Sequence, residues 1–569
     1  MSRKLRVAVW LESYNIAAWF YACIAKVVQS RYAEIILMIV GSEGKGESKI
    51  SKIKRDRKAC LLFHFYRHID RWFSPDLLDA QELKDIRKLL QNVPIIQLDL
   101  SDLKNLKTSE TEILERIKKY RIDVIVKQEL QDDLSGIKDT VKYGIWGYRF
   151  GKMSSQPSCV CGFWEVMLKE PVTWSSLVRI SADGNTEDVL YSSTSQTDHI
   201  SIQRNNNRVY WKTLEYIPRV LRELYDLGEY EFYKLIRKRN LHLTCPSDKT
   251  RTMPKWYEVI ILVGRLYWRY CVKKISLFLC FEQWFILFNL SCEKADKTEI
   301  AGYKRLLPPR DRFWADPFVV EKEGAYHIFL EEYVYKENKG HIACLSISKN
   351  GEYTKPIKAL VANCHLSYPC LFQHKDILYM IPETAEQQVI DLYQCVSFPN
   401  RWEKVKTLMS GIKAVDTTIL LHNDLWWLFT SFPENEGISN YDEIFVYYSD
   451  DLLSREWIPH PKNPVVSDVR SARSAGRIFK SNSHLYRPSQ NCSLRYGYSI
   501  NINKITTLTK QEYNEVCVEQ IEPDSNCGIL ATHTVNHIEG ITVIDAMRKQ
   551  TRYPQLSIVP KLRLFTQFC

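Results

Sequence analysis

The hydrophobic pattern divides the chain into two halves with different periodicities. In the first half, short continuous apolar runs alternate with segments whose apolar residues recur at helical spacing. Residues 5–11 and 33–40 predict buried strands, and residues 16–28 between them predict a helix. The rhythm returns with strands at 94–98 and 122–126, separated by a second helix. This alternation predicts an α/β domain with a parallel sheet, whose ligands bind beyond the carboxyl ends of the strands.

From about residue 281 the chain changes to short strands rich in aromatic and β-branched residues, separated by turn signals. The strands fall into a loose repeat of roughly 40 to 60 residues, as expected for four-stranded blades. Five inner strands are predicted to begin at the motifs Trp314–Phe318, His365–Pro369, Val415–Thr418, Ala472–Gly476 and Thr532–Thr534. The apolar strand 283–287 is predicted to join the last blade, which closes the ring and removes open sheet edges.

These patterns predict an α/β domain over residues 1–235, a helical linker over 236–280 and an all-β five-bladed propeller over 281–569. A chain of 569 residues is too long for one hydrophobic core. Charged residues interrupt the apolar stretch 256–290, so no transmembrane helix is predicted. We expect an amphipathic helix packed on one of the domains, and peripheral contact with a membrane surface is the alternative.

Composition narrows the function classes. The net charge is +11, but the one dense basic run, 45–58, lacks interleaved aromatic residues, which predicts a solvated loop and no nucleic-acid partner. The 16 cysteines are scattered and form no second pair that could complete a metal site. Because the first residues also lack the apolar stretch of a secretion signal, we expect a reduced, cytoplasmic setting and no bound metal.

The first domain carries two motifs in a familiar order, 143–152 (Tyr-Gly-Ile-Trp-Gly-Tyr-Arg-Phe-Gly-Lys) and 162–166 (Gly-Phe-Trp-Glu-Val). Together with the order of elements, they make this domain resemble the catalytic domain of formyltransferases that use 10-formyltetrahydrofolate. The resemblance implies an Asn-x-His pair, which polarises the formyl group and handles the proton of the attacking amine, and a later Asp.

Gly147 and Arg149 stand where the resemblance places the Asn and the His, and Asp183 or Asp188 matches the later Asp. Glycine has no amide to donate, and arginine cannot act as a base at neutral pH. We therefore expect a degenerate formyltransferase site. No cofactor is expected with certainty, and 10-formyltetrahydrofolate would be the cofactor only if this domain is active.

The second half closely resembles the amino-terminal domain of plant glucosamine inositolphosphorylceramide transferases and their bacterial relatives. The motifs that carry this resemblance are Trp-Ala-Asp-Pro-Phe at 314–318, His-Leu-Ser-Tyr-Pro at 365–369, Met-Ile-Pro-Glu at 380–383, Val-Asp-Thr-Thr at 415–418 and Tyr-Arg-Pro-Ser-Gln-Asn at 486–491. It implies a five-bladed propeller similar to furanose-cleaving glycosidases, which use a base on the first blade, an aspartate on the third and an acid glutamate on the fourth.

Asp316 and Asp416 match the first two of these positions, whereas the fourth blade opens with Arg473 and Ser474 in place of an acid. Glu383, on the second blade, could supply the acid, since glycoside cleavage needs two carboxyl groups on opposite sides of the bond. A pair of acids beside an arginine is also typical of proteins that only bind sugar hydroxyls or a phosphate.

Further side chains are predicted to bind the substrate: Arg473, His533, His365, Trp314 and Arg487. His365 could equally be a core histidine, and the tryptophans could serve blade packing. The expected partner is a sugar, a nucleotide sugar or a glycolipid head group. Three hypotheses remain: a carbohydrate-active enzyme of glycan or glycoconjugate biosynthesis, a formyltransferase acting on an amino sugar, and a non-catalytic glycan-binding module.

Overall fold

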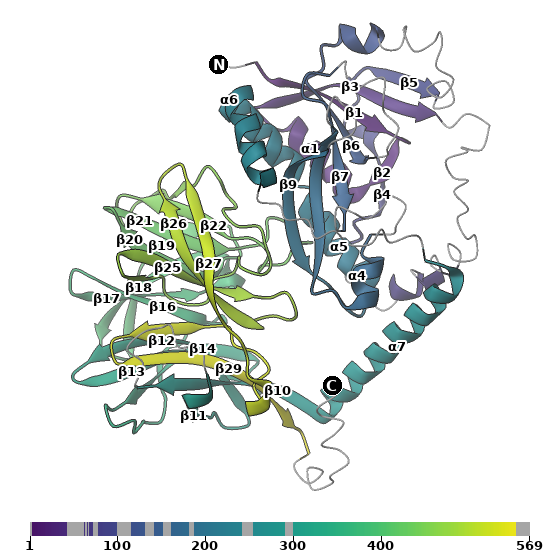
Figure 1. Ribbon diagram of the computed structural model, residues 1–569. Helices are drawn as coiled ribbons and strands as arrows, with labels where there is room; N and C mark the ends of the chain where they lie inside the picture. Colours follow the sequence, from purple (N-terminus) through teal and green to yellow (C-terminus); the bar gives the residue numbers. More distant parts are fainter. Residues whose placement is uncertain are drawn as a thin grey trace. The chain divides into compact units, whose positions relative to one another are not determined.

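The computed structural model describes residues 3–42, 62, 65–66, 68–71, 78–99, 115–130, 141–151, 161–180, 187–241, 254–290 and 300–553. The chain divides into two compact units, one of residues 1–269 with 435–438 and one of residues 270–434 with 439–569. Figure 1 traces the first unit in purple to teal and the second in teal to yellow.

A seven-stranded mixed sheet forms the centre of the first unit. In spatial order its strands are β5 (Ile95–Asp99), β3 (Ala33–Ser42), β1 (Leu5–Leu11), β6 (Val124–Glu129), β7 (Ile145–Phe150), β8 (Val172–Ile180) and β9 (Glu187–Gln196). The five strands from β5 to β7 are parallel, whereas β8 and β9 run antiparallel to their neighbours. The predicted α/β class is confirmed, and the parallel part matches the strands predicted from continuous apolar runs, which are typical of strands covered on both faces.

The helices of this unit are α1 (Ala18–Val28), α4 (Phe163–Leu168), α5 (Ile202–Thr213) and α6 (Tyr216–Leu241), and α7 (Trp256–Leu279) follows them. Helix α1 buries Trp19, Phe20, Cys23, Ile24 and Val27, which lie one turn apart on one face. Strand β2 (Asn15–Ala17), directly before α1 in the sequence, pairs antiparallel with β4 (Leu83–Asp85) in a small two-stranded sheet. Among the residues that the structure describes, no helix is both long and apolar enough to cross a bilayer.

The second unit contains five four-stranded antiparallel sheets, the blades of a propeller (Figure 1). Blade 1 is β12 (Arg312–Lys322), β13 (Ala325–Val334), β14 (Lys339–Ile347) and β15 (Ile357–Leu360). Blade 2 is β16 (Ser367–His374), β17 (Ile377–Glu383), β18 (Val389–Ser397) and β19 (Arg401–Ser410). Blade 3 is β20 (Val415–His422), β21 (Leu425–Ser431), β22 (Phe445–Ser449) and β23 (Ile458–Pro459).

Blade 4 is β24 (Phe479–Ser481), β25 (His484–Asn491), β26 (Ser499–Leu508) and β27 (Tyr513–Ile521). Blade 5 is β28 (Val535–Ile538), β29 (Ile541–Thr551), β10 (Cys280–Asn289) and β11 (Lys304–Leu306). Strand β10 comes before the other blades in the chain, yet it pairs along its whole length with β29, so that Phe285 lies opposite Ala546. This pairing closes the ring as predicted, and it leaves no open edge between the first and last blades.

The core of the propeller lies between neighbouring blades. One apolar cluster joins Ile286 and Phe288 of blade 5 to Val319 and Ile328 of blade 1. Similar clusters join blades 1, 2 and 3, blades 3 and 4, and blades 4 and 5. Because every blade packs against the next, the starts of the inner strands are held at one central axis.

Candidate functional site

The inner strands of blades 1 to 3 share one irregularity near their first residues. In each, the pairing register with the next strand gains one residue on the inner strand, which is a β-bulge. The bulges place Asp316, Tyr368 and Asp416 in left-handed backbone conformations, with φ of 51°, 41° and 47°. Such conformations cost about 1–3 kcal/mol each in non-glycine residues and cluster at functional sites. The repeated strain marks the centre of the ring as the candidate site.

The second strands of blades 1 and 2 add two glutamates at equivalent places. Glu331 on β13 lies opposite Ala315, and Glu383 on β17 lies opposite Ser367, in each case just before the bulge. The sequence reasoning singled out Glu383 but missed Glu331. We call the side chains gathered at the axis the hub: Asp316, Glu331, Glu383, Asp416, Arg473, His533 and Asp545.

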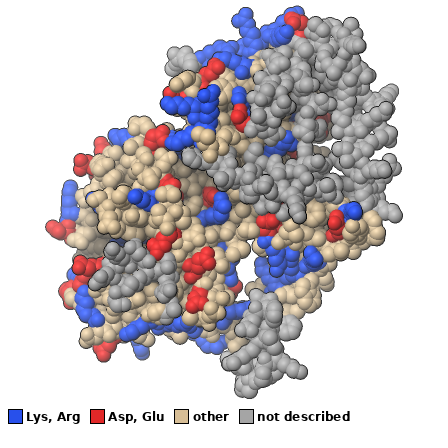
Figure 2. All heavy atoms as spheres, in the orientation of Figure 1, with Lys and Arg blue, Asp and Glu red and all other residues tan. Residues whose placement is uncertain are grey.

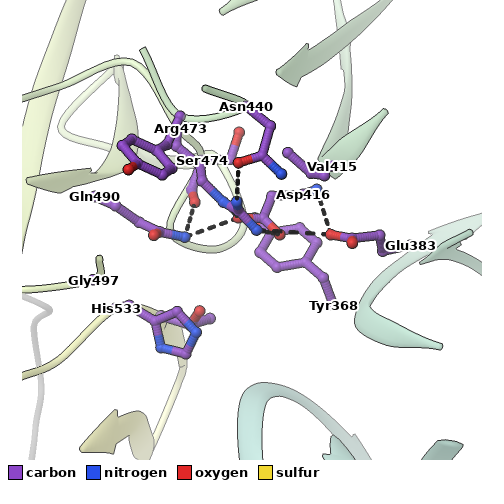
Figure 3. A network of polar contacts seen from close by, with 12 residues as sticks. Tyr368, Glu383, Val415, Asp416, Asn440, Arg473, Ser474, Gln490, Gly497 and His533 are labelled. Atoms are coloured by element: carbon purple, nitrogen blue, oxygen red, sulfur yellow. Dashed lines mark hydrogen bonds and ion pairs between the residues drawn. The ribbon is translucent and has the colours of Figure 1, made fainter. Parts of the chain in front are cut away.

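Asp416 lies at the centre of a polar network in the hub (Figure 3). Arg473 donates to it through Nε and also through Nη2, at 3.1 Å from Oδ1, and Gln490 Nε2 donates at 2.8 Å. The backbone N–H of Asp416 in turn lies 3.3 Å from Glu383 Oε2. A two-pronged arginine contact is typical of a strong, directional ion pair. Blades 2, 3 and 4 therefore meet in one polar network.

Arg473, from the start of blade 4, is the buried cation of this network. Its side chain is 8% exposed, its Nη2 lies 3.8 Å from Glu383 Oε2, and its Nη1 donates to Asn440 Oδ1 at 3.3 Å. The guanidinium also lies 5.0 Å from the centre of the Tyr496 ring, a cation–π geometry. Burial alone would lower the pKa of Arg473, but Asp416 outweighs it, so Arg473 is a permanent cation in the hub.

A second network links blades 5 and 1. Thr534 Oγ1 donates to Asp316 Oδ1 at 2.7 Å, and the Asp316 backbone N–H donates to Asp545 Oδ2 at 2.9 Å. His533 lies between the two aspartates, with Nε2 at 3.4 Å from Asp316 Oδ1 and Nδ1 at 2.7 Å from Asp545 Oδ2, the latter contact being off the line of an ideal hydrogen bond. Burial lowers the pKa of His533, but Asp545 and Asp316 raise it to about 9, so the ring is an imidazolium at neutral pH.

Ligand atoms of Asp316, His533 and Asp545 lie within 4.8 Å of one another, which is close enough to hold a metal ion. However, Asp545 Oδ1 already accepts the backbone N–H groups of His533 and Thr534, and Oδ2 accepts that of Asp316. Backbone donors therefore already engage both oxygens of Asp545.

Burial separates the pKa values of the hub carboxyl groups. It raises the pKa of Asp316 to about 6, where His533 lowers and Asp416 raises the value. It raises the pKa of Glu383 to about 8, where Asp416 adds to the effect and Arg473 opposes it. Burial together with Asp316 also raises the pKa of Glu331 well above its ordinary value. At neutral pH, Asp316 is thus mostly an anion and Glu383 mostly a neutral acid, and a divergence of this kind is typical of acid and base pairs.

His365 reaches the hub from its outer side. Its Nδ1 accepts the backbone N–H of Gly340 at 3.0 Å, which leaves the Nε2 proton facing Glu331 Oε1 at 3.4 Å. Burial lowers the pKa of His365, so the ring is neutral. The structure therefore brings His365, Arg473 and His533 together with the three carboxyl groups predicted as catalytic.

Two predicted binding residues lie elsewhere. Trp314 is buried in the apolar cluster between blades 5 and 1, and its indole N–H donates to Glu332 at 2.9 Å. Arg487, on β25, is 1% exposed and pairs at 2.6 Å with Glu515 on β27, two strands away in blade 4. Both contacts are those of residues that hold a blade together.

In the first unit, Gly147 and Arg149 lie on β7. A Cβ atom at residue 147 would come within 2.6 Å of Leu130 Cγ, so an asparagine there would have to displace Leu130. Arg149 donates to the Leu130 carbonyl at 3.1 Å. Asp188 accepts from Arg179 Nε at 3.1 Å, and Asp183 lies outside the described residues. These contacts give neither Gly147 nor Arg149 the geometry of a formyl-transfer site.

Fold and hub together define a five-bladed propeller with carboxyl groups from separate blades at its axis. Residues 307–538 match the family described as "Glucosamine inositolphosphorylceramide transferase 1, N-terminal".

Among its relatives, the protein named glucosamine inositolphosphorylceramide transferase 1 of Arabidopsis thaliana is 35% identical over 207 residues, which cover 36% of this chain and 27% of the relative. The protein of the same name from Oryza sativa subsp. japonica is 34% identical over 209 residues, which cover 36% of this chain and 28% of the relative. The matched region thus spans little more than a quarter of these relatives.

Solved structures give weaker likenesses. A β-xylosidase/α-arabinofuranosidase from a compost metagenome is 13% identical with a TM-score of 0.31, covering 42% of this chain and 91% of its own. A glycinamide ribonucleotide transformylase from Symbiobacterium toebii is 7% identical with a TM-score of 0.26, covering 38% of this chain and 86% of its own. At such scores these likenesses support no argument about function.

Proposed function

We propose that the propeller binds a sugar residue of a glycan or glycoconjugate at its hub and carries out acid–base chemistry on its glycosidic bond. The observation that carries this proposal is the pKa difference between two hub carboxyl groups, about 6 for Asp316 and about 8 for Glu383. Glycosidic bond cleavage or transfer needs one protonated and one ionised carboxyl group. The name of the plant relatives, which contains both a sugar and a transferase, supports the same class of function.

In this proposal Glu383 acts as the general acid and donates its proton to the leaving oxygen. Its side chain is 13% exposed, so it is more open to a ligand than Asp416 at 2%. Asp316 acts as the base or stabilises positive charge that develops on the sugar. Asp416 and Arg473 position Glu383, because Asp416 donates its backbone N–H to the Glu383 carboxyl group and Arg473 lies beside it.

The charge of the hub limits the substrate class. Its five carboxyl groups, of which Glu383 is mostly neutral and Glu331 also has a raised pKa, outnumber its two cations, and Arg473 and His533 are each already paired with an aspartate. A phosphate would have to enter beside these carboxyl groups without an unused cation to receive it. A neutral sugar or an amino sugar meets no such repulsion, and an ammonium group would be attracted. We therefore expect an amino sugar or a neutral sugar to bind here and a sugar phosphate to be rejected.

Thermal unfolding of the full chain with glucosamine, glucose or glucose 6-phosphate tests this preference. A ligand at 100 times its dissociation constant stabilises the native state by about 2.7 kcal/mol. We expect stabilisation by glucosamine or glucose, a smaller effect in Glu383→Gln, and the full effect in Glu403→Gln, an exposed glutamate on the outer strand β19 of the same blade. Stabilisation by the phosphate alone would contradict the proposal.

Comparing substrates with different leaving groups distinguishes a catalytic role of Glu383 from a role in sugar binding. A general acid matters less when the leaving group is already a weak base. On any glycoside that proves to be a substrate, Glu383→Gln should therefore lose about 10²–10⁴-fold in kcat with an alkyl leaving group and much less with a nitrophenyl one. Asp316→Asn should lose activity with both. Sugar binding without turnover of either substrate would leave a glycan-binding module in place of an enzyme.

A further inference from the structure

Helix α7 has one apolar face that is packed and a second that is not. Val259, Leu262 and Leu266 are buried in a cluster with Phe163 and Ile202 of the first unit. These three positions form the stripe expected of an amphipathic helix that packs on a domain. The predicted packing therefore accounts for one side of α7, and it leaves the other side of the helix to be explained.

The other side carries large apolar residues that are exposed to solvent. Their exposed fractions are Tyr257 42%, Ile260 50%, Ile261 49%, Tyr267 67%, Trp268 67%, Ile275 49% and Phe278 67%. At 3.6 residues per turn these positions fall within one arc of roughly 120° on the helix surface. No charged residue falls within the arc. Contiguous exposed apolar surface of this kind marks an interaction site.

Basic side chains flank this arc. Arg265 lies beside one edge of the arc, and Lys274 lies beside the other edge near the carboxyl-terminal end of the helix. Lys274 Nζ lies 5.5 Å from the centre of the Tyr270 ring, which holds the charge against the helix. Glu258 is the one acidic residue of α7. In Figure 2, blue Lys and Arg atoms lie beside tan atoms along the course that α7 follows in Figure 1.

We propose that α7 is a docking surface for an anionic lipid bilayer, on which the helix lies parallel to the membrane. The exposed arc would enter the boundary between head groups and acyl chains, where Trp and Tyr rings are favoured because they combine an apolar body with a polar edge. Arg265 and Lys274 would then reach the lipid phosphates. The helix lies on the bilayer and does not cross it, because charged residues interrupt its sequence.

The charges of α7 argue against a second copy of the chain as the occupant. A symmetric dimer would bring the arcs of two helices together and their basic edges with them. With a single acidic residue per helix, these edges could not be matched by opposite charges. A bilayer with anionic head groups supplies both the apolar layer and the negative charge.

Flotation of the full chain with lipid vesicles tests the proposal. We expect binding to vesicles of phosphatidylcholine with phosphatidylglycerol, and weaker binding to phosphatidylcholine alone. Ile261→Glu and Trp268→Glu should each lower the partition coefficient at least tenfold. Tyr230→Glu, at a residue of α6 that is 79% exposed, is the matched control and should bind as the wild type does. Far-UV circular dichroism and the melting temperature establish that each variant is folded.

The basic edge gives a second measurement. Arg265→Gln and Lys274→Gln should each weaken binding to the anionic vesicles by about fivefold, since a basic residue near such a surface contributes about 1 kcal/mol. The same changes should have little effect on phosphatidylcholine vesicles. Added salt should reduce the difference between wild type and variants.

Three outcomes would overturn the proposal. The first is a wild-type chain that fails to float with anionic vesicles at low salt. The second is a folded Trp268→Glu variant that floats as well as the wild type. The third is a dimer in light scattering that Trp268→Glu dissociates, without vesicle binding, which would assign the arc to a second copy. Because the vesicles contain no sugar, each outcome leaves the proposal for the hub unaffected.

Discussion

Replacing Arg473 by methionine tests whether the hub depends on its central ion pair. The change removes the guanidinium and keeps most of the aliphatic chain. Asp416, whose side chain is 2% exposed, would then retain Gln490 as a donor but lose its cation. Removing one partner of a buried ion pair typically costs 3–5 kcal/mol, because the other charge is left buried and uncompensated. We expect a loss of stability of about 3–5 kcal/mol.

Differential scanning calorimetry of the full chain measures this loss in the unfolding transition of the propeller. For a domain of this size, 1 kcal/mol shifts the melting temperature by roughly 2 °C, so the expected shift is about 6–10 °C. Lys462→Met is the control, because its partner Glu512 and the lysine itself are 47% and 33% exposed. An exposed pair contributes about 1 kcal/mol or less, which predicts a shift of no more than about 2 °C.

A double variant decides whether the uncompensated charge is the cause. Adding Asp416→Asn to Arg473→Met removes the stranded carboxylate, and asparagine tolerates the left-handed φ of 47° at residue 416. The double variant should therefore regain much of the stability that the single variant loses, with a coupling energy of up to about 3 kcal/mol. If the double variant is no more stable than Arg473→Met alone, packing rather than charge explains the loss, and our reasoning is refuted.

Two further predictions concern pH and the first unit. The pKa values of Asp316, Glu383 and His533 are all raised in the folded state, to about 6, 8 and 9, so the folded chain holds protons that the unfolded chain releases, and these groups lower stability as pH rises. The melting temperature of Glu383→Gln relative to the wild type should therefore increase from pH 5 to pH 8, and a constant or falling difference would contradict the raised pKa. In the first unit, Gly147→Ala should cost about 1–3 kcal/mol in denaturant unfolding, because the new methyl group meets Leu130, and Leu130→Ala in the same chain should relieve part of this cost.

Short sequence motifs were sufficient to predict the hub residues that lie at the blade starts. The turn after each blade start recurs in sequence, so Asp316 and Asp416 could be placed at equivalent positions before any pairing was known. The closing strand was found because β10 is a strongly apolar run with no partner nearby in the sequence. In the first unit, continuous apolar runs identified the parallel strands, because a strand that is buried on both faces is apolar at nearly every residue.

Register, in contrast, cannot be read from a motif. Blade 1 ends its second strand with two adjacent acids, Glu331 and Glu332, and adjacent residues of a strand point to opposite faces. Glu331 lies opposite Ala315 and joins the hub, whereas Glu332 lies opposite Trp314 and bonds its indole. A shift of one residue would exchange the two roles.

The same pairing provides the signal that would have separated them. Counting outward from each bulge, Glu331 and Glu383 occupy the same place in blades 1 and 2, and Ser431 occupies it in blade 3. Aligning the blades on their bulges therefore shows which of the two adjacent acids, Glu331 or Glu332, faces the hub. By the same rule, the hub can gain or lose an acid at this place without any change of fold, so residues here decide the chemistry of the propeller while the blades preserve its form.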